Sequence, residues 1–409
     1  MGSSLYKWVS VGFFNLLLAA TLGCILRYKI LYSLPLIDQS FLLHAHSHFA
    51  FSGWVTHILM VLMWGYLYKY LPAHLLGKYK WLVIANLVAA YGMLLSFPWE
   101  GYGIVSIIFS SLSIVVSYVF AINFWKDLDK IKVKIISKYW FKAALIFSVL
   151  SSFGVYSLSY IMANNIQHPD WFLASTYYFL HFQYNGWFFF ACMGLLNEHI
   201  KSAVSFSVQK QIFWLFALAC VPAYFLSALW LPIPTWIYIV VVMAAAAELL
   251  GWIFLLRSII LKKKELLKHI SIQTKWLFIL SAVALSIKLL LQLGSVIPAL
   301  SKLAFGFRPV VIGYLHLMFL GVITLFILGF CKMSEFIVTS KKGNTGITIF
   351  IAGIILNEML LMIQGLSYMN YITILYINEM LLAVAVVMFF GLLLLNTGIR
   401  KTSNSLPDN

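Results

Sequence analysis

Charged residues are scarce in this chain. Asp, Glu, Lys and Arg together make up only 10% of the 409 residues, whereas 63% are hydrophobic and the mean hydropathy is +0.95. A soluble globular domain carries about 25% charged residues, so this composition excludes one. Most of the chain must contact lipid, and we expect a polytopic membrane protein.

Cysteines and long polar stretches are also few. The four cysteines, Cys24, Cys192, Cys220 and Cys331, are scattered and form no Cys-x-x-Cys-His motif. This spacing argues against a disulfide framework and against covalently attached haem, and we interpret the cysteines as apolar helix residues. The longest polar connections are too short to fold alone. We therefore predict a single membrane domain over residues 1–409, so that any electron-donor domain must be another protein.

The chain instead contains many long apolar runs. A helix needs about 20 apolar residues to cross the hydrocarbon core of a bilayer. Such runs predict an all-α protein with twelve transmembrane helices, at residues 8–26, 46–68, 81–97, 101–125, 140–163, 171–196, 211–230, 235–256, 275–297, 308–331, 346–366 and 372–397.

The basic residues support this arrangement independently. Lys and Arg number 28 against 12 acidic residues, and most of them fall on alternate connections and at the two ends of the chain. By the positive-inside rule, both termini lie in the cytoplasm. The net charge of +16 then reflects topology and attraction to anionic lipids rather than nucleic-acid binding. We expect a multi-pass protein of a cell membrane, of the bacterial inner-membrane kind.

Three of the expected helices carry one pattern, a histidine followed five residues later by a glycine. The pattern occupies residues 48–53, 181–186 and 316–321, about one third of the chain apart, on the second, sixth and tenth helices. Equivalent positions on every fourth helix predict three parallel four-helix repeats, forming three arcs at approximately 1–138, 139–272 and 273–409. The three histidines then lie at one depth in the outer half of the membrane.

Histidines at matched depths predict a cofactor or metal site, because polar groups inside a membrane are expensive and usually functional. A single histidine in an apolar helix is more often a hydrogen-bonded packing residue than a ligand, but three at matched positions favour ligation. The glycine of the pattern permits close helix packing or leaves room for a flat macrocycle, and both interpretations stay open.

The second helix carries four histidines within fourteen residues. At 100° per residue, His44 and His48 share one face, whereas His46 and His57 lie on another. The repeated pattern selects His48 for the interior, with His44 as a second ligand or a supporting partner. The roles of His46 and His57 stay open.

Twelve spans with histidines on the second, sixth and tenth resemble the catalytic subunit of haem-copper oxidases and nitric oxide reductases (cytochrome c oxidase subunit I-like). Residues 175–184, Ser-Thr-Tyr-Tyr-Phe-Leu-His-Phe-Gln-Tyr, look like the family's Thr-Tyr-Tyr followed by His-Phe-His-Tyr, although the family has it on the tenth helix. Residues 44–51, His-Ala-His-Ser-His-Phe-Ala-Phe, also look like the start of NnrS proteins, which are small relatives linked to haem, copper and nitric oxide.

The resemblance implies haem ligation by His48 and His316, with His44 as a further candidate, and a metal site, copper in this family, at His181, His316 and His48. The family's histidine pair on the seventh helix and second histidine on the tenth are missing. We therefore expect a haem-binding protein with an incomplete haem-copper centre. It would act in electron transfer or in reduction or handling of O2 or NO, as an oxidoreductase if it is an enzyme. A separate donor subunit or cytochrome c would supply electrons.

Five other polar residues fall inside the expected spans: Lys288, Gln292, Glu248, Glu358 and Glu379. Each is costly alone in lipid, so these residues indicate either buried ion pairs or a proton or ion pathway. Two other functional classes also stay open. One is a proton- or metal-coupled transporter or channel built on parallel repeats, and the other is a cofactor-free subunit derived from an oxidase.

Overall fold

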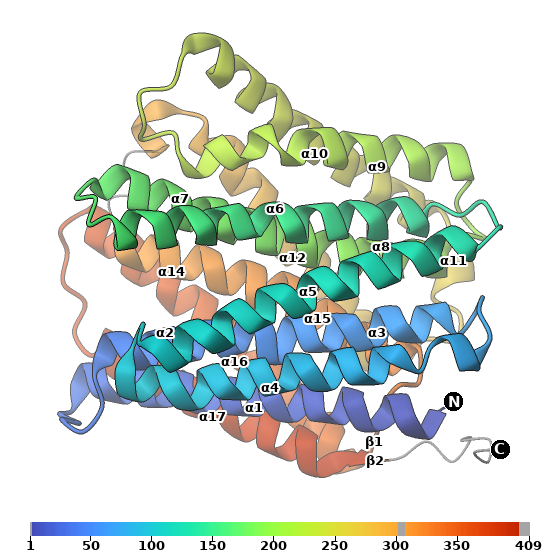
Figure 1. The fold of residues 1–409 in the computed structure, drawn as a ribbon, viewed down its shortest axis with the longest axis horizontal. Coiled ribbons are helices and arrows are strands. Elements are labelled where there is room, and N and C mark those ends of the chain that lie inside the picture. The colour runs from blue at the N-terminus through green and yellow to red at the C-terminus, as the bar shows by residue number, and fades with distance from the viewer. Residues whose placement is uncertain (1, 302–306, 401–409) are drawn as a thin grey trace. The chain divides into compact units, whose positions relative to one another are not determined.

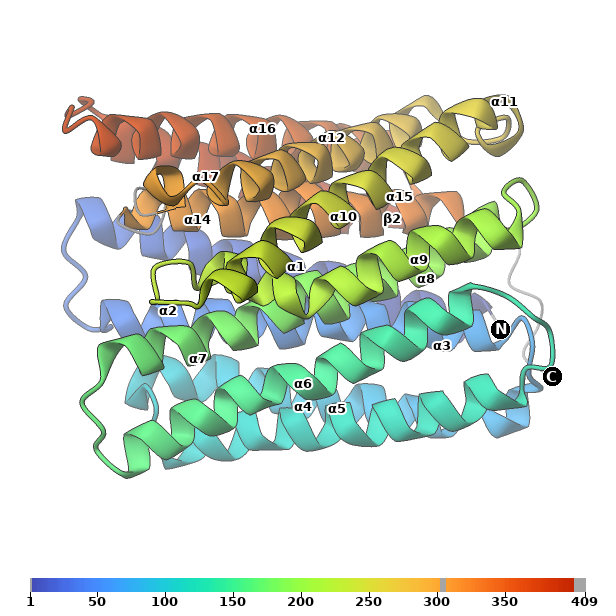
Figure 2. The same ribbon diagram turned by 90° about the horizontal axis from the view of Figure 1, so that it is seen from above.

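The computed structural model describes residues 2–301 and 307–400 and consists almost entirely of helices (Figures 1 and 2). Lipid offers no partners for backbone N–H and C=O groups, and a helix satisfies these groups within its own segment. The long apolar runs of the sequence accordingly form long helices. The predicted class, an all-α polytopic membrane protein, is confirmed.

The chain divides into two compact units. The first comprises Met1–Lys130 and Thr324–Asn409, and the second comprises Ile131–Ile323. These units are defined by packing, whereas the three repeats concern equivalent sequence positions. The repeats stay a prediction.

The first unit combines both ends of the chain. It contains α1 (Gly2–Leu31), α2 (Gln39–Phe49), η1 (Ala50–Thr56), α3 (His57–Leu67), η2 (Ala73–Leu75), α4 (Lys78–Glu100), α5 (Ile104–Lys130), α15 (Leu325–Met333), β1 (Val338–Thr339), α16 (Lys341–Met369), α17 (Ile377–Gly398) and β2 (Ile399–Arg400). Helix α16 packs along α17, and α4 packs along α5. The two short strands pair antiparallel, Val338 with Arg400 and Thr339 with Ile399.

The second unit is the middle of the chain. It contains α6 (Ser137–Ala163), α7 (Pro169–His181), η3 (Phe182–Phe188), α8 (Phe189–Ile200), α9 (Phe206–Cys220), η4 (Pro222–Ser227), α10 (Thr235–Leu261), α11 (Lys263–Leu266), α12 (Ile272–Ser295), α14 (Arg308–His316) and most of η5 (Leu317–Thr324). Helices α6 and α7 lie side by side, and α9 packs on α10 (Figures 1 and 2).

Ten helical segments within the described residues are long and apolar enough to cross a membrane, and they correspond to ten of the twelve expected spans. The other two expected spans are not among these ten segments. Residues 171–196 lie within α7, η3 and α8, and residues 211–230 cover the shorter α9 with η4. The count of twelve and the cytoplasmic termini therefore stay predictions.

Several helices begin at side chains that the sequence places just before an apolar run. Asp38 accepts hydrogen bonds from the backbone N–H groups of Ser40 and Phe41 at the start of α2. Ser205, Ser271 and Ser340 similarly cap α9, α12 and α16. Such residues satisfy N–H groups that have no partner within the helix, so they fix where each helix starts.

A π-helical segment begins one or two residues after each histidine of the repeated pattern. These segments are η1 after His48, η3 after His181 and η5 after His316. In η1 and η3 the backbone bonds reach five residues back, from His57 to Ser52 and from Phe189 to Tyr184. Short π-helical stretches inside α-helices are rare and occur frequently at functional sites.

Side chains of neighbouring helices bond the carbonyl groups of these segments. Asn15 donates to the carbonyl oxygen of Gly53 at 2.6 Å, and Asn86 donates to that of Ser52 at 3.1 Å. In the second unit, the hydroxyl of Ser281 donates to the carbonyl oxygen of Val322 at 2.8 Å. The π-helical segments are thus anchored to adjacent helices by buried polar contacts, which a purely apolar helix cannot make.

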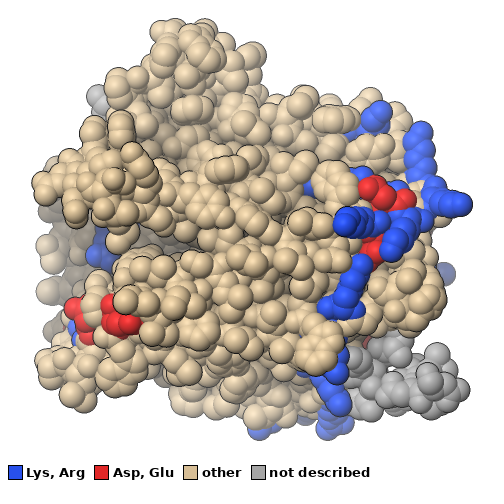
Figure 3. All heavy atoms as spheres, in the orientation of Figure 1, with Lys and Arg blue, Asp and Glu red and all other residues tan. Residues whose placement is uncertain are grey.

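At the surface, basic side chains concentrate near the ends of helices. On the face shown in Figure 3, Lys and Arg side chains gather where α5 ends, whereas most of the surface along the helices carries none. The basic residues at the end of α5 include Lys126 and Lys130, and Lys130 pairs with the buried Asp127 at 2.8 Å. This distribution is typical of helices whose middle lies in hydrocarbon.

Candidate functional site

An ionic pair lies buried in the second unit. Glu248 belongs to α10 and Lys288 to α12, and each residue is only 4% exposed. The Nζ atom of Lys288 is 4.0 Å from Oε2 of Glu248. This distance is too long for a direct hydrogen bond but short enough for strong electrostatic attraction and for one bridging water.

Three buried oxygen atoms near this pair accept no hydrogen bond from the described residues. They are Oε2 of Glu248, Oε1 of Gln292, one turn beyond Lys288 on α12, and Oδ1 of Asn185. A buried polar atom without a partner costs about 1–3 kcal/mol, and native proteins hold few of them. Each of these oxygens can accept a hydrogen bond from a water molecule or another donor.

His181 is held at both ring nitrogens. Nε2 lies 2.8 Å from the carbonyl oxygen of Cys220, and Nδ1 lies 3.1 Å from the amide nitrogen of Asn185. A carbonyl can only accept, so Nε2 carries the proton and Nδ1 accepts from Asn185. The Cys220 sulfur is 4.0 Å from Nε2 and bonds the carbonyl oxygen of Asn185 at the same distance. Cys220 of α9 thereby contacts His181 at the end of α7 and Asn185 in η3.

Electrostatic interactions join these contacts into one group. Lys288 interacts with His181 and Cys220, and Glu248 also interacts with Cys220. We call the group the polar cluster, and it consists of His181, Asn185, Cys220, Glu248, Lys288 and Gln292. All six side chains are buried.

Two tyrosines border the polar cluster. Tyr314 of α14 interacts electrostatically with Glu248, and its ring centroid is 6.5 Å from that of Tyr184 in η3. Tyr184 is itself buried. Phenolic hydroxyls both donate and accept, so they can extend a hydrogen-bonded path from the cluster.

The sequence identified only part of this cluster. It predicted that Glu248, Lys288 and Gln292 lie inside spans, and the structure pairs Glu248 with Lys288, which also interacts electrostatically with His181. Gln292 lies one turn from Lys288 on α12. It missed Asn185 and treated Cys220 as an apolar helix residue. A signal for Asn185 existed, because a polar side chain four residues after a histidine lies on the same helix face. Cys220 contacts His181 through its backbone carbonyl oxygen. Every residue has such an oxygen, so the residue type gives no signal for this contact.

The other two glutamates of the predicted path belong to the first unit. Glu358 of α16 accepts a hydrogen bond from Asn357 at 3.1 Å. Glu379 lies in the first turn of α17 and is exposed. Neither contributes to the polar cluster, and their role in a proton or ion path stays a prediction.

His44 and His48 share one face of α2, as the sequence predicted. Nε2 of His48 lies 3.1 Å from the hydroxyl of Tyr102, and its ring stacks on Phe97 with centroids 4.5 Å apart. The His44 ring is 4.6 Å from that of Tyr102. Burial raises the pKa of Tyr102, which lies in the connection after α4, so its hydroxyl stays protonated at neutral pH.

The remaining histidines of interest contact backbone carbonyls. Nδ1 of His316 donates to Ile312 at 2.8 Å, and Nδ1 of His46 donates to Ala19 at 3.0 Å. His57 donates from Nε2 to Trp8 at 2.9 Å. His46 and His57 thus tie α2 and α3 to α1, which gives both a packing role.

These contacts test whether the histidines fit haem or copper. A metal binds an imidazole nitrogen through its lone pair, and the lone pair of His181 already accepts from Asn185. His181 therefore does not fit a metal in this arrangement. Nδ1 of His316 donates to a backbone carbonyl, as metal-ligating histidines commonly do with the ring nitrogen that does not bind the metal. In the described part of the chain, no three or more His, Cys, Asp or Glu residues form a group that could hold a metal.

The glycines of the repeated pattern lie close to neighbouring side chains. A Cβ atom at Gly53 would lie 2.6 Å from the Phe49 ring, and one at Gly186 would lie 2.5 Å from Phe147. At Gly321 it would lie 3.0 Å from Ala284. Phe147 and Ala284 belong to α6 and α12, so Gly186 and Gly321 lie at close contacts between helices. The interpretation of these glycines as room for a macrocycle stays a prediction.

Comparisons with known proteins identify no family for this chain. No family model matches it, and no curated protein matches it.

Proposed function

We propose that this chain is a proton-coupled membrane transport protein whose polar cluster takes up and releases a proton. The observation that carries the proposal is the Glu248–Lys288 pair, 4.0 Å apart and buried in a segment suited to lipid. Both groups titrate, so one proton can pass from the ammonium to the carboxylate and leave two neutral groups. Intramembrane ionisable residues typically mark such proton routes.

The neighbours of the pair support this role. Each charged group at this depth would be costly alone, yet the surrounding oxygens of Gln292 and Asn185 are not fully bonded. A purely structural ion pair is stable only when further hydrogen bonds satisfy its remaining atoms. Incomplete bonding instead suits a site that changes protonation state during a transport cycle.

Proton uptake by reconstituted vesicles tests the proposal. The purified chain is placed in liposomes that contain a pH-sensitive dye, and a potassium diffusion potential drives protons inward. The unmodified chain should acidify the interior, whereas Glu248→Gln should fall to the rate of protein-free vesicles. Glu265→Gln, the same change on the exposed short helix α11, is the control and should retain the original rate. Equal rates for Glu248→Gln and the unmodified chain would refute the proposal.

A second candidate function is haem binding with a role in electron transfer or in handling O2 or NO. The specific observation is His316, whose Nδ1 donates to Ile312 and whose helix continues directly into η5. In this candidate His316 would be an iron ligand, and the haem would supply redox chemistry. His48 and His44 are further ligand candidates, copper is a possible second metal, and a donor subunit or cytochrome c would be the partner.

Optical spectroscopy with metal analysis separates the two candidates. A haem protein shows a Soret band that shifts on reduction, and His316→Ala should abolish or shift it. A colourless protein without iron or copper would eliminate this candidate and leave the proton-coupled function untouched.

The finer topology belongs to the same proposal. We propose twelve spans with both termini in the cytoplasm of a bacterial cell. Alternation of basic and non-basic connections supports this orientation. Each proposed four-helix repeat then begins on the same side of the membrane.

A further inference from the structure

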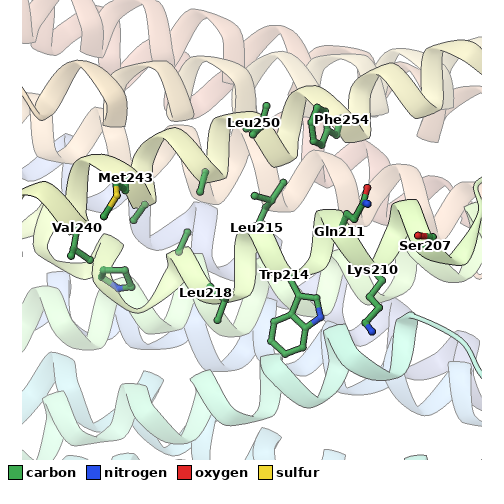
Figure 4. A pocket seen from close by; sticks show the side chains of 14 residues that line it. Ser207, Lys210, Gln211, Trp214, Leu215, Leu218, Val240, Met243, Leu250 and Phe254 are labelled. Carbon is green, nitrogen blue, oxygen red and sulfur yellow. The ribbon is translucent and has the colours of Figure 1, made fainter.

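A long groove runs between α9 and α10 in the second unit (Figure 4). Its volume is about 870 Å³, within the range of about 300–1,000 Å³ typical of ligand clefts. Small residues form its floor, chiefly Ala219, Ala244 and Ala247. Ala219 and Ala244 belong to a buried apolar cluster that supports the groove from behind.

The polar and the apolar side chains that line the groove lie in different parts of it. Ser207, Lys210 and Gln211, the polar side chains of the groove, lie at one end (Figure 4). The remainder is apolar, from Trp214 and Leu218 on α9 to groups on α10. Lys210 is the one charged residue among the described residues that line the groove. The groove therefore presents a cationic, hydrogen-bonding end and an apolar channel.

The groove also matches the depth of one membrane leaflet. From Lys210 to Pro222, where α9 gives way to η4, the helix rises about 18 Å at about 1.5 Å per residue. Half of a hydrocarbon core of about 30 Å is about 15 Å. A ligand with a charged head at Lys210 would thus have room for a chain that extends to the middle of the bilayer.

From the charge, the division of the lining and its length, we infer that the groove binds one phospholipid with an anionic head group. The head group contacts Lys210, with Ser207 and Gln211 as hydrogen-bond partners, and an acyl chain lies against Trp214 and the alanine floor. Anionic lipids gain about 1 kcal/mol from each basic side chain near the surface, which corresponds to roughly fivefold in affinity.

Native mass spectrometry of the full chain in detergent tests this inference. Phosphatidylglycerol and phosphatidylcholine with identical acyl chains are titrated separately, and the affinity for the first bound lipid is measured. Phosphatidylglycerol should bind roughly fivefold more tightly, and Lys210→Gln should remove this preference. Lys262→Gln removes the same charge beyond the end of α10 and should preserve it. Equal binding of the two lipids, or an unchanged preference in Lys210→Gln, would overturn the inference.

A second pair of variants tests the apolar part of the groove. Ala247→Trp fills the channel and should weaken binding of both lipids, whereas Ala246→Trp, on the adjacent exposed position outside the lining, should not. Glycerol phosphate carries the anionic head without a chain and should not displace bound phosphatidylglycerol. Displacement by glycerol phosphate, or binding unaffected by Ala247→Trp, would show a simple anion site and contradict the lipid groove.

Discussion

Removing one member of a buried ionic pair costs more than removing both. The remaining charge keeps its desolvation penalty and loses the partner that offset it. Glu248 and Lys288 meet this condition, because both are 4% exposed and 4.0 Å apart. The pair therefore leads to a prediction about stability, and this prediction does not depend on proton movement.

Glu248→Leu and Lys288→Met should each lower the free energy of unfolding by about 3 kcal/mol or more. The double variant should lose much less than the sum of the two, since no uncompensated charge remains. Thermal unfolding of the four proteins in one detergent measures this coupling. Losses in the double variant equal to the sum of the single losses would show that the two side chains do not interact.

The hydrogen bonds that Asp38 accepts at the start of α2 should depend on pH. Hydrogen bonds from the Ser40 hydroxyl and from the N–H groups of Phe41 and Ser40 hold the pKa of its carboxyl below the usual value. The cap is thus present above the ordinary aspartate pKa of about 3.9 and is lost only as the pH falls below it.

Hydrogen exchange of the Phe41 amide measures this cap. Protection should persist at pH 3.9 and disappear at lower pH. Asp38→Asn should keep the protection with no such pH dependence, because asparagine also caps helices, whereas Asp38→Ala should lose it at every pH. Loss of protection in the unmodified chain well above pH 3.9 would be inconsistent with a lowered pKa.

At the scale of helices, the closest packing occurs between α16 and α17. A Cβ atom at Gly346 would lie 2.5 Å from the backbone nitrogen of Leu395 and 2.6 Å from the carbonyl oxygen of Gly391. One at Gly391 would meet the backbone of Phe350 at 2.7 Å. Small residues let membrane helices approach until their backbones touch, which provides packing energy that lipid cannot replace.

Gly346→Ala should lower the free energy of unfolding by about 1–3 kcal/mol, because backbone atoms cannot move aside as a flexible side chain can. Gly294→Ala is the matched control. No described atom lies within 4 Å of a Cβ at Gly294, near the end of α12. The control should be neutral or slightly stabilising, and thermal unfolding in detergent compares the two. Equal stability of both variants would contradict the close approach of α16 and α17.

The π-helical segments show what a helix pattern does and does not predict. The repeated histidine and glycine predicted three equivalent positions, and η1, η3 and η5 begin at or next to them. The change from α- to π-helical bonding depends on partners such as Asn15 and Ser281, which lie far away in the sequence. Local propensity therefore indicates where the irregularity falls but not its form.

At the scale of the whole chain, hydropathy predicted the class and most of the spans, because the energy of burying apolar side chains in lipid is a local property of the sequence. It did not predict the polar cluster, since the meeting of α10 with α12 and of η3 with α9 depends on tertiary packing. The metal interpretation of His181 rested on residue type and position. Its two ring contacts are visible only in the structure.

The region of residues 169–227 decides between ten and twelve spans. Single cysteines at His168 and at Ala203, before α7 and after α8, can be labelled with a membrane-impermeant thiol reagent in intact cells and in inverted vesicles. Twelve spans require that His168→Cys labels from outside and Ala203→Cys from the cytoplasm. Labelling of both from the same side would mean that residues 169–200 do not cross the membrane.

The central claim is that Glu248 exchanges a proton inside the membrane. Infrared difference spectroscopy of the reconstituted chain, recorded across a pH titration, detects the carbonyl stretch of a protonated carboxylic acid directly. A carboxylic acid band that changes with pH is expected in the unmodified chain and in Glu265→Gln, whereas Glu248→Gln should lose the component of this band that arises from the buried carboxyl group. A set of titrating bands in Glu248→Gln that is identical to that of the unmodified chain would contradict proton exchange at Glu248.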